Sequence, residues 1–276
     1  MKKVKKLYDY MTLYPWLSGI TENILKGDMD CRLPLQNDNG KTLSVLLNGP
    51  SLTETIQYLD RSKTDVMMVN EAVKTDLYRE LKPEYFCVAD FLYFRPTKEN
   101  YMLFKSMEEI NRDVVLFYPG NLNQSVILWG RDFNIRPVYA VSMFWDVEAY
   151  SYNLLRQNSI SPYFINVGIM ALYVGIQLGY KKIVLYGADL SIFKDLSVNE
   201  DLQVEAVIMH YYEKEPKKIN QTQMFRRSYN MTHEMRTLYQ TFAQFSVVAR
   251  YAADAGVKIL NMSRESMLDC FEKYRG

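Results

Sequence analysis

Short apolar runs alternate with segments of helical periodicity along most of the chain. Residues 43–47 form an apolar run that stops at an Asn-Gly-Pro-Ser sequence, and apolar residues with helical spacing follow it. This pattern predicts a strand, a tight turn and a helix, and similar units recur toward the C-terminus. The expected strands are residues 43–47, 65–69, 85–89, 114–118, 137–141, 182–186 and 257–260. The expected helices are residues 52–59, 72–80, 102–110, 167–178 and 231–255, with a terminal helix after the last strand.

This alternation predicts an α/β fold with a Rossmann-like, mainly parallel sheet and helices on both faces. We expect one such domain over residues 42–276, preceded by a helical N-terminal extension, residues 1–41. Residues 191–230, called the lid segment below, are polar and break the alternation. A segment of this length is either a disordered insertion or a lid over an active site. Its apolar residues at 204 and 207–209 favour partial order.

Polar residues follow four of the predicted strands: Asn48, Asn70, Asp90 and Asp189. In a parallel sheet, ligands bind beyond the carboxyl ends of the strands. Asn and Asp at such places also form local turns with their own backbone, and this is their commoner use. Because the four residues recur at equivalent positions, the sequence favours a shared site.

The turn at residues 48–51 carries features of an anion site. Gly49 allows a ligand to approach the backbone, and Ser51 with Glu54 predicts a capping box at the following helix. Free amides at a helix N-terminus favour a phosphate or another anion. An ordinary structural turn of an α/β protein would have the same sequence, so the turn alone leaves both interpretations open.

Composition narrows the class of protein. The 276 residues are 48% hydrophobic, enough for a substantial core, and the net charge of +1 predicts no nucleic-acid partner. Three widely spaced cysteines indicate a reducing compartment, and the sequence shows neither a membrane-spanning run nor a signal peptide. We therefore expect a cytoplasmic protein. The basic, aromatic start of the chain favours a solvated helix and also permits peripheral association with the inner membrane face.

Two histidines, His210 and His233, are the natural candidates for proton transfer at neutral pH. His233 lies at a predicted helix start, where a capping or solvent role is the default. His210 lies in the lid segment before Tyr211 and Tyr212, which makes it a candidate general base. A partly buried histidine in an aromatic cluster explains the same sequence. Motifs typical of zinc proteases, esterases, P-loop enzymes and dinucleotide-binding domains do not occur.

Four features together resemble the bacterial sialyltransferases of glycosyltransferase family 42: the turn at residues 48–51, Asn70, the block of residues 166–189, and the His210-Tyr211 pair. The resemblance covers about residues 43–260. It implies a GT-A-like variant of the Rossmann-like fold and inverting transfer from a CMP-sugar co-substrate, with no metal and no bound cofactor. It also implies a glycan or glycolipid acceptor, in bacterial surface polysaccharide or lipooligosaccharide synthesis.

The resemblance also implies roles for individual residues. His210 would take the proton of the acceptor hydroxyl. The donor nucleotide and phosphate would contact Asn48, Gly49, Pro50, Ser51, Asn70 and Asp90. The donor sugar would contact Asn166, Val167 and Gly168.

The chain departs from the family where tyrosines would hold the leaving phosphate, since Ser191 stands in their region and no tyrosine follows it up to residue 196. We expect other groups to take over this role. The candidates are Asp189, Ser191, Lys194, Tyr211, Tyr212, Arg226 and Arg227. The donor is then sialic acid or another CMP-linked acidic sugar.

Two alternatives remain open from the sequence. An enzyme resembling hydroxymethylpterin diphosphokinases would bind ATP with magnesium held by Asp90 and Asp189. A non-catalytic nucleotide-binding protein could retain the same fold. The tyrosine-rich composition also permits a homo-oligomer.

Overall fold

The computed structural model describes residues 40–119, 135–138, 161–225 and 229–275. Within them lies an eight-stranded sheet of order β11-β10-β6-β1-β2-β3-β4-β5, in which every neighbouring pair is parallel. A three-stranded antiparallel sheet, β7-β8-β9, belongs to the lid segment. The predicted α/β class with a mainly parallel sheet is confirmed.

The strands are β1 (Thr42–Leu46), β2 (Thr64–Val69), β3 (Tyr85–Cys87), β4 (Val115–Pro119), β5 (Ile135–Val138), β6 (Lys182–Tyr186), β7 (Leu196–Val198), β8 (Val204–Ile208), β9 (Lys217–Asn220), β10 (Lys258–Asn261) and β11 (Glu272–Lys273). The α-helices are α2 (Leu52–Thr55), α3 (Asp76–Leu81), α4 (Lys98–Ile110), α7 (Val167–Gln177), α8 (Gln221–Phe225) and α9 (Met231–Asp254). Short 3₁₀ helices span Ile56–Tyr58, Asn70–Lys74, Phe91–Phe94 and Ile192–Asp195.

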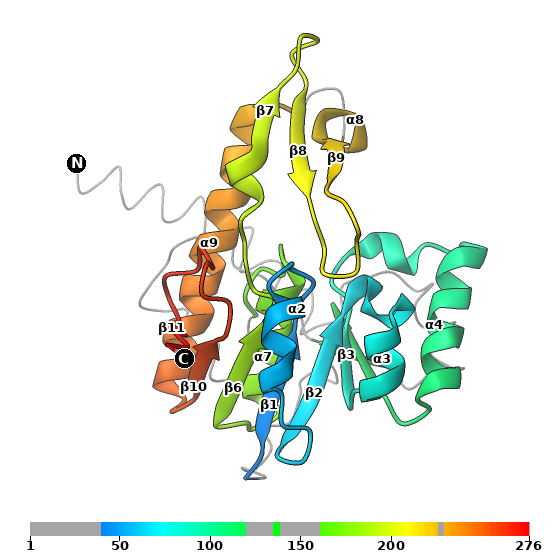
Figure 1. Cartoon of the computed structure of the whole chain (residues 1–276), viewed down its shortest axis with the longest axis vertical. Coiled ribbons are helices and arrows are strands. Elements are labelled where there is room, and N and C mark those ends of the chain that lie inside the picture. Colours follow the sequence, from blue (N-terminus) through cyan, green and yellow to red (C-terminus); the bar gives the residue numbers. More distant parts are fainter. Residues whose placement is uncertain (1–39, 120–134, 139–160, 226–228, 276) are drawn as a thin grey trace, which may run out of the picture.

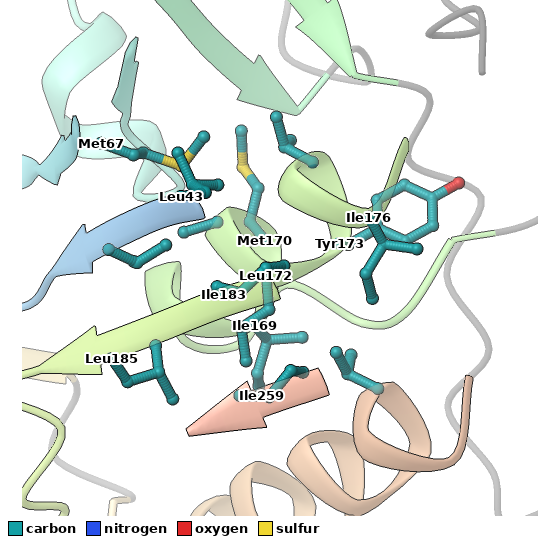
Figure 2. Close-up of a cluster of buried hydrophobic side chains, with 14 of the residues drawn as sticks. Leu43, Met67, Ile169, Met170, Leu172, Tyr173, Ile176, Ile183, Leu185 and Ile259 are labelled. Carbon is teal, nitrogen blue, oxygen red and sulfur yellow. The ribbon is translucent and has the colours of Figure 1, made fainter. Parts of the chain in front are cut away.

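Alternating side chains of β1 build two cores on opposite faces of the sheet. Leu43 and Val45 pack with α7 and α9, whereas Leu46 packs with residues of α2, α3 and α4. Figure 2 shows the first core, where side chains of α7 lie against those of β1, β6 and β10. Helices therefore cover both faces, as predicted.

Helix α7 is buried around its whole circumference, from Gly168 to Gln177. Its glycines allow it to lie close to the sheet: a Cβ at Gly168 would come within 2.9 Å of Leu47 Cδ1, and one at Gly175 within 2.7 Å of Leu43 Cδ2. Gly168, a predicted contact of the donor sugar, thus serves helix packing in the structure. This packing fixes the start of α7 beside the end of β1.

The predicted terminal helix is wrong. After β10 the chain turns and forms β11, which pairs in parallel with β10. The serine side chains of this turn bond the end of β6: Ser263 Oγ accepts from the amide of Ala188 at 3.0 Å, and Ser266 Oγ donates to the Ala188 carbonyl at 2.6 Å. Such side-chain bonds to backbone compete with helix formation.

Several other predictions differ at their boundaries or lie outside the described residues. Strand β3 ends at Cys87, two residues before the predicted end, and only the start of the predicted strand 137–141 is described, within β5. Most of the predicted N-terminal extension, residues 1–39, lies outside the described part. Within the described part, no helix is long and apolar enough to span a bilayer.

The lid segment stands over the carboxyl ends of the parallel strands (Figure 1). The loop between β8 and β9 reaches down to the ends of β1 and β2, while α8 lies at the remote end of the segment. Helix α9 runs alongside and returns the chain to β10.

Candidate functional site

The order of the sheet reverses between β1 and β6. Strands β2 to β5 follow on one side of β1, and β6, β10 and β11 lie on the other. Loops that leave such a switch point in opposite directions open a crevice between them. A cavity of about 660 Å³ lies there, lined by the ends of β1, β2 and β6, the start of α7, the lid segment and the first turns of α9.

The turn at residues 48–51 is closed by internal hydrogen bonds. The Gly49 amide donates to the Gly187 carbonyl at 3.0 Å, the Ser51 amide donates to Asp189 Oδ2 at 3.0 Å, and Pro50 has no amide hydrogen. A Cβ at Gly49 would lie 2.5 Å from Gly187 O and still closer to Asp189. The prediction of free amides is therefore wrong for Gly49 and Ser51, and at Ser51 the Asp189 carboxylate, in a residue 8% exposed, takes the place of an anion.

The predicted capping box at Ser51 and Glu54 is also wrong. Helix α2 has only four residues, and no side chain caps its first turn. The Ser51 hydroxyl instead bonds the Ser263 hydroxyl at 2.6 Å. Ser51 therefore ties the turn to the segment after β10 and does not line the cavity.

Asn48 and Asn70 line the cavity at the ends of β1 and β2. Their side-chain Oδ1 atoms are buried and have no hydrogen-bond partner within the described chain. Asn70 also has a φ of 50°, in the left-handed region that asparagine tolerates better than most residues. A buried, unpaired amide oxygen costs roughly 1–3 kcal/mol, so both residues offer acceptors for hydroxyl or amino donors of a ligand.

The N-terminus of α7 also faces the cavity, through Ile165, Asn166 and Val167. Asn166 caps the helix, since its Oδ1 accepts from the Gly168 amide at 2.8 Å. The dipole of this 11-residue helix places positive potential at its start. None of the described lining residues is a lysine or an arginine. In this lining, the start of α7 is therefore the natural place for an anion.

His210 lines the cavity from the loop between β8 and β9. Glu213 Oε2 accepts from the His210 amide at 2.7 Å and lies 3.0 Å from His210 Nδ1. The imidazole also stacks on the Tyr212 ring, with centroids 5.2 Å apart and an interplanar angle of 7°. A carboxylate at Nδ1 places the hydrogen there and leaves Nε2 as the proton acceptor.

The Glu213 side chain is 8% exposed. Burial would raise its pKa, but the bond from Lys217 Nζ at 2.6 Å and the two bonds from His210 outweigh burial and lower the pKa from 4.5 to about 2. Glu213 is therefore a carboxylate at neutral pH. It orients the His210 ring and stabilises the imidazolium that forms when the ring takes a proton.

Tyr211 and Tyr212 hold the lid segment and do not line the cavity. The Tyr211 amide donates to the Asn48 carbonyl at 3.1 Å, and the Tyr211 hydroxyl lies 3.0 Å from Thr75 Oγ1. Burial raises the pKa of both phenols, and the Glu71 carboxylate raises that of Tyr212 further. Both hydroxyls therefore remain protonated at neutral pH.

The cavity gathers nine of the predicted site residues: Asn48, Gly49, Pro50, Asn70, Asn166, Val167, Asp189, Ser191 and His210. Asp90 lies elsewhere, and its carboxylate accepts from the Leu92 amide at 2.8 Å. Lys194 is exposed on the lid segment. Arg226 and Arg227 lie outside the described residues.

Sequence reasoning missed four polar residues: Glu213, Gln221, Tyr229 and Glu234. Glu213 could have been predicted, because it follows His210 by only three residues, close enough for the two side chains to touch. The last three line the cavity only because the fold brings α8 of the lid segment, Tyr229 and the start of α9 together around it, and no local pattern signals this.

No family model matches the chain, and no curated protein sequence matches it. Three solved structures from Campylobacter jejuni resemble its chain path. They are the sialyltransferase CstII in complex with a substrate analogue, cytidine-5'-monophosphate (17% identity, 86% of this chain and 85% of that one, TM-score 0.46), the monofunctional alpha-2,3-sialyltransferase Cst-I (17%, 86% and 81%, 0.48) and an alpha-2,3-sialyltransferase in apo form (18%, 87% and 82%, 0.44). At these values the likeness carries no inference about the site.

Proposed function

We propose that the protein is an inverting glycosyltransferase that uses a CMP-activated acidic sugar, with His210 as general base. The observation that carries the proposal is the His210–Glu213 pair, held over a cavity at the switch point of a parallel sheet. A carboxylate-oriented imidazole beside a crevice that can hold a nucleotide is suited to activating an acceptor hydroxyl. The motifs that suggested the family 42 sialyltransferases support the same assignment.

The arrangement of polar groups suggests how the donor binds. Hydroxyl or amino groups of the nucleoside would satisfy the unpaired oxygens of Asn48 and Asn70. The phosphate would lie at the start of α7, near Asn166 and Val167, and Ser191 would contribute a hydroxyl. This placement moves the phosphate away from the turn at residues 48–51. Arg226 and Arg227 remain candidates for further contacts with the leaving group.

The reaction follows from this placement. His210 Nε2 takes the proton of the acceptor hydroxyl while the acceptor oxygen forms a bond to the anomeric carbon. The bond from that carbon to the phosphate oxygen breaks, and its electron pair leaves with CMP. Positive potential at the start of α7 stabilises the leaving phosphate without a metal. A single displacement of this kind inverts the anomeric centre.

The diphosphokinase alternative is less well supported. It requires Asp90 and Asp189 at one metal site, but Asp90 caps the 3₁₀ helix Phe91–Phe94 while Asp189 bonds Ser51. Within the described residues, no group of three His, Cys, Asp or Glu side chains could hold a metal ion. The non-catalytic alternative gives the His210–Glu213 pair no role.

The cellular setting is proposed from the sequence alone. We place the enzyme in the cytoplasm, with peripheral contact at the inner membrane face, where glycan or glycolipid acceptors for surface polysaccharide or lipooligosaccharide are assembled. Self-association into a homo-oligomer is part of this proposal.

Thermal unfolding with nucleotides tests the donor. A ligand that binds only the folded protein stabilises it by about 2.7 kcal/mol at a concentration 100 times its Kd. We expect CMP and CMP-N-acetylneuraminic acid to raise the melting temperature and ATP with magnesium to leave it unchanged. A shift with ATP and magnesium alone would overturn the proposal in favour of the kinase.

A further inference from the structure

The cavity continues beyond the proposed donor site, into the space between the lid segment and α9. Its lining there includes Gln221 of α8 and one face of α9, with Glu234, Thr237 and Thr241 spaced three and four residues apart. Helix α8 lies at the end of the lid segment remote from β1 (Figure 1). The donor proposal leaves this part of the cavity unused.

Two buried polar residues in this part of the cavity offer hydrogen-bond acceptors. Gln221 is 6% exposed, and its Oε1 atom is buried with no partner in the described chain. Glu234 is 4% exposed and accepts from the Tyr229 hydroxyl at 2.6 Å. Burial is the main cause that raises the pKa of Tyr229 to about 12, and the hydrogen bond to Glu234 adds to it. The Tyr229 hydroxyl therefore keeps its hydrogen at neutral pH.

Hydrogen bonds hold these residues in place before any ligand binds. Thr222 Oγ1 accepts from the Val204 amide of β8 at 2.9 Å and donates to the Tyr229 carbonyl at 2.9 Å. Tyr229 in turn bonds Glu234 on α9. The chain of contacts joins the lid sheet, α8 and α9, so the backbone next to Gln221 and the Tyr229–Glu234 pair are held in place.

The chemistry of this wall matches a sugar ring. A planar amide oxygen and a carboxylate accept hydrogen bonds from hydroxyl groups. The Phe225 and Tyr229 rings, with centroids 5.0 Å apart, add an aromatic surface in the same lining, and Phe225 is 53% exposed. Few placed polar groups on an apolar wall are typical of a small-molecule site.

We propose that Gln221, Glu234 and the Phe225–Tyr229 ring pair form a subsite for a neutral, hydroxyl-bearing sugar of the acceptor. The subsite rests on the proposed glycosyltransferase function. The acceptor would reach from it toward His210, where its reacting hydroxyl loses a proton.

Titration of the full-length protein with methyl glycosides tests the subsite. The probes are methyl β-galactoside, methyl β-glucoside and methyl β-lactoside, together with methyl 2-amino-2-deoxy-β-glucoside as a cationic probe, measured by ligand-observed NMR. We expect at least one neutral glycoside to bind. Its Kd should rise about tenfold in Gln221→Leu and in Glu234→Gln, the loss of about one hydrogen bond to a buried partner. Gln223→Leu, an exposed position on the same helix, is the matched control and should bind as the wild type does.

The outcomes separate the subsite from the donor proposal, because CMP binding is measured on the same samples. Binding of CMP without binding of any neutral glycoside overturns the subsite alone. Binding of a neutral glycoside, weakened in both variants, without binding of CMP supports the subsite and counts against the donor. The subsite is overturned if only the cationic methyl 2-amino-2-deoxy-β-glucoside binds. It is also overturned if both variants fold and bind the neutral glycosides with the same affinity as the wild type. Glu234→Gln preserves the shape of the side chain and can still accept a hydrogen bond from Tyr229, so we expect this variant to fold. It keeps the test decisive if Gln221→Leu does not fold.

Discussion

The amide of Tyr211 donates a hydrogen bond to the carbonyl oxygen of Asn48 at 3.1 Å. This bond joins the lid segment to the end of β1. It places His210, the preceding residue, close to an asparagine that we assign to the donor nucleoside. Because both partners are backbone atoms, the relative position of base and donor site does not depend on the two side chains.

Replacing Glu213 with glutamine should slow turnover without weakening donor binding. The variant loses the negative charge that stabilises an imidazolium at His210, and carboxylates that orient a histidine in metal sites typically contribute about 10–100-fold to activity. We expect kcat to fall by that amount and KM for the donor to stay constant. Glu215→Gln, exposed in the same loop, is the control. Equal kcat in wild type and Glu213→Gln would remove Glu213 from the mechanism.

The acid stability of the protein should also depend on Glu213. The pKa of this carboxyl is lowered in the folded state, from 4.5 to about 2. Its contribution to stability is therefore present above pH 4.5 and is lost as the pH falls toward 2. Melting temperatures between pH 6 and pH 2 should fall more steeply in the wild type than in Glu213→Gln. The lowered pKa of Asp60 is common to both proteins and cancels in the comparison. Parallel curves would contradict the assignment.

Gly49→Ala should destabilise the fold strongly. The added Cβ would lie 2.5 Å from the Gly187 carbonyl oxygen, a backbone atom that cannot move aside without shifting the end of β6. We expect a loss of about 2–4 kcal/mol in the free energy of urea unfolding, at the upper end for single substitutions. Gly256→Ala meets no atom within 4 Å and carries only the cost of its positive φ. A smaller loss for Gly49→Ala than for Gly256→Ala would show that the turn has another geometry.

Asn48→Ala should weaken CMP binding more than it weakens the fold. The buried Oδ1 has no partner in the free protein, and the amide nitrogen makes only a 3.5 Å contact with the Val69 carbonyl. We expect the Kd for CMP, measured by calorimetry, to rise about five- to tenfold, which corresponds to roughly one hydrogen bond. The melting temperature without ligand should change little. Unchanged affinity would place the nucleoside elsewhere.

Tyr180→Phe should weaken the fold and leave CMP binding unchanged. The Tyr180 hydroxyl donates to buried Asp65 at 2.5 Å, and Lys41 Nζ bonds the other oxygen at 2.7 Å. Asp65 lies near the start of β2, away from the cavity at its end. Removal of the hydroxyl should cost about 1–3 kcal/mol of unfolding free energy and leave the Kd for CMP unchanged. A change in that Kd would show coupling between the two ends of the sheet.

The strands and their polar ends could be predicted because the information is local. Mostly apolar runs mark β1, β2 and β6, and the polar residues Asn48, Asn70 and Asp189 come within three residues of their ends. The lid sheet was not predicted because its strands have three to five residues and mix polar with apolar side chains. The residue spacing of such short strands gives no clear period.

The errors at the site arise from contacts between distant parts of the chain. Ser51 lacks its expected capping role because Ser263 and Asp189, far away in sequence, take its hydroxyl and its amide. The predicted terminal helix does not form because the side chains of Ser263 and Ser266 bond the backbone of Ala188, just after β6. Only folding brings these partners together, so a local pattern cannot reveal them.

The most direct test of the account is the release of CMP from CMP-N-acetylneuraminic acid in the presence of neutral methyl glycosides, compared between wild type, His210→Ala and His233→Ala. His233 is the other histidine and lies exposed at the start of α9. We expect His233→Ala to keep most of the wild-type rate, because His233 reaches the acceptor subsite only through stacking of its ring on Tyr229. His210→Ala should lose about 10²–10⁴-fold in rate, the usual contribution of a general base, while CMP still raises its melting temperature. Turnover of His210→Ala at the wild-type rate would contradict the proposed mechanism.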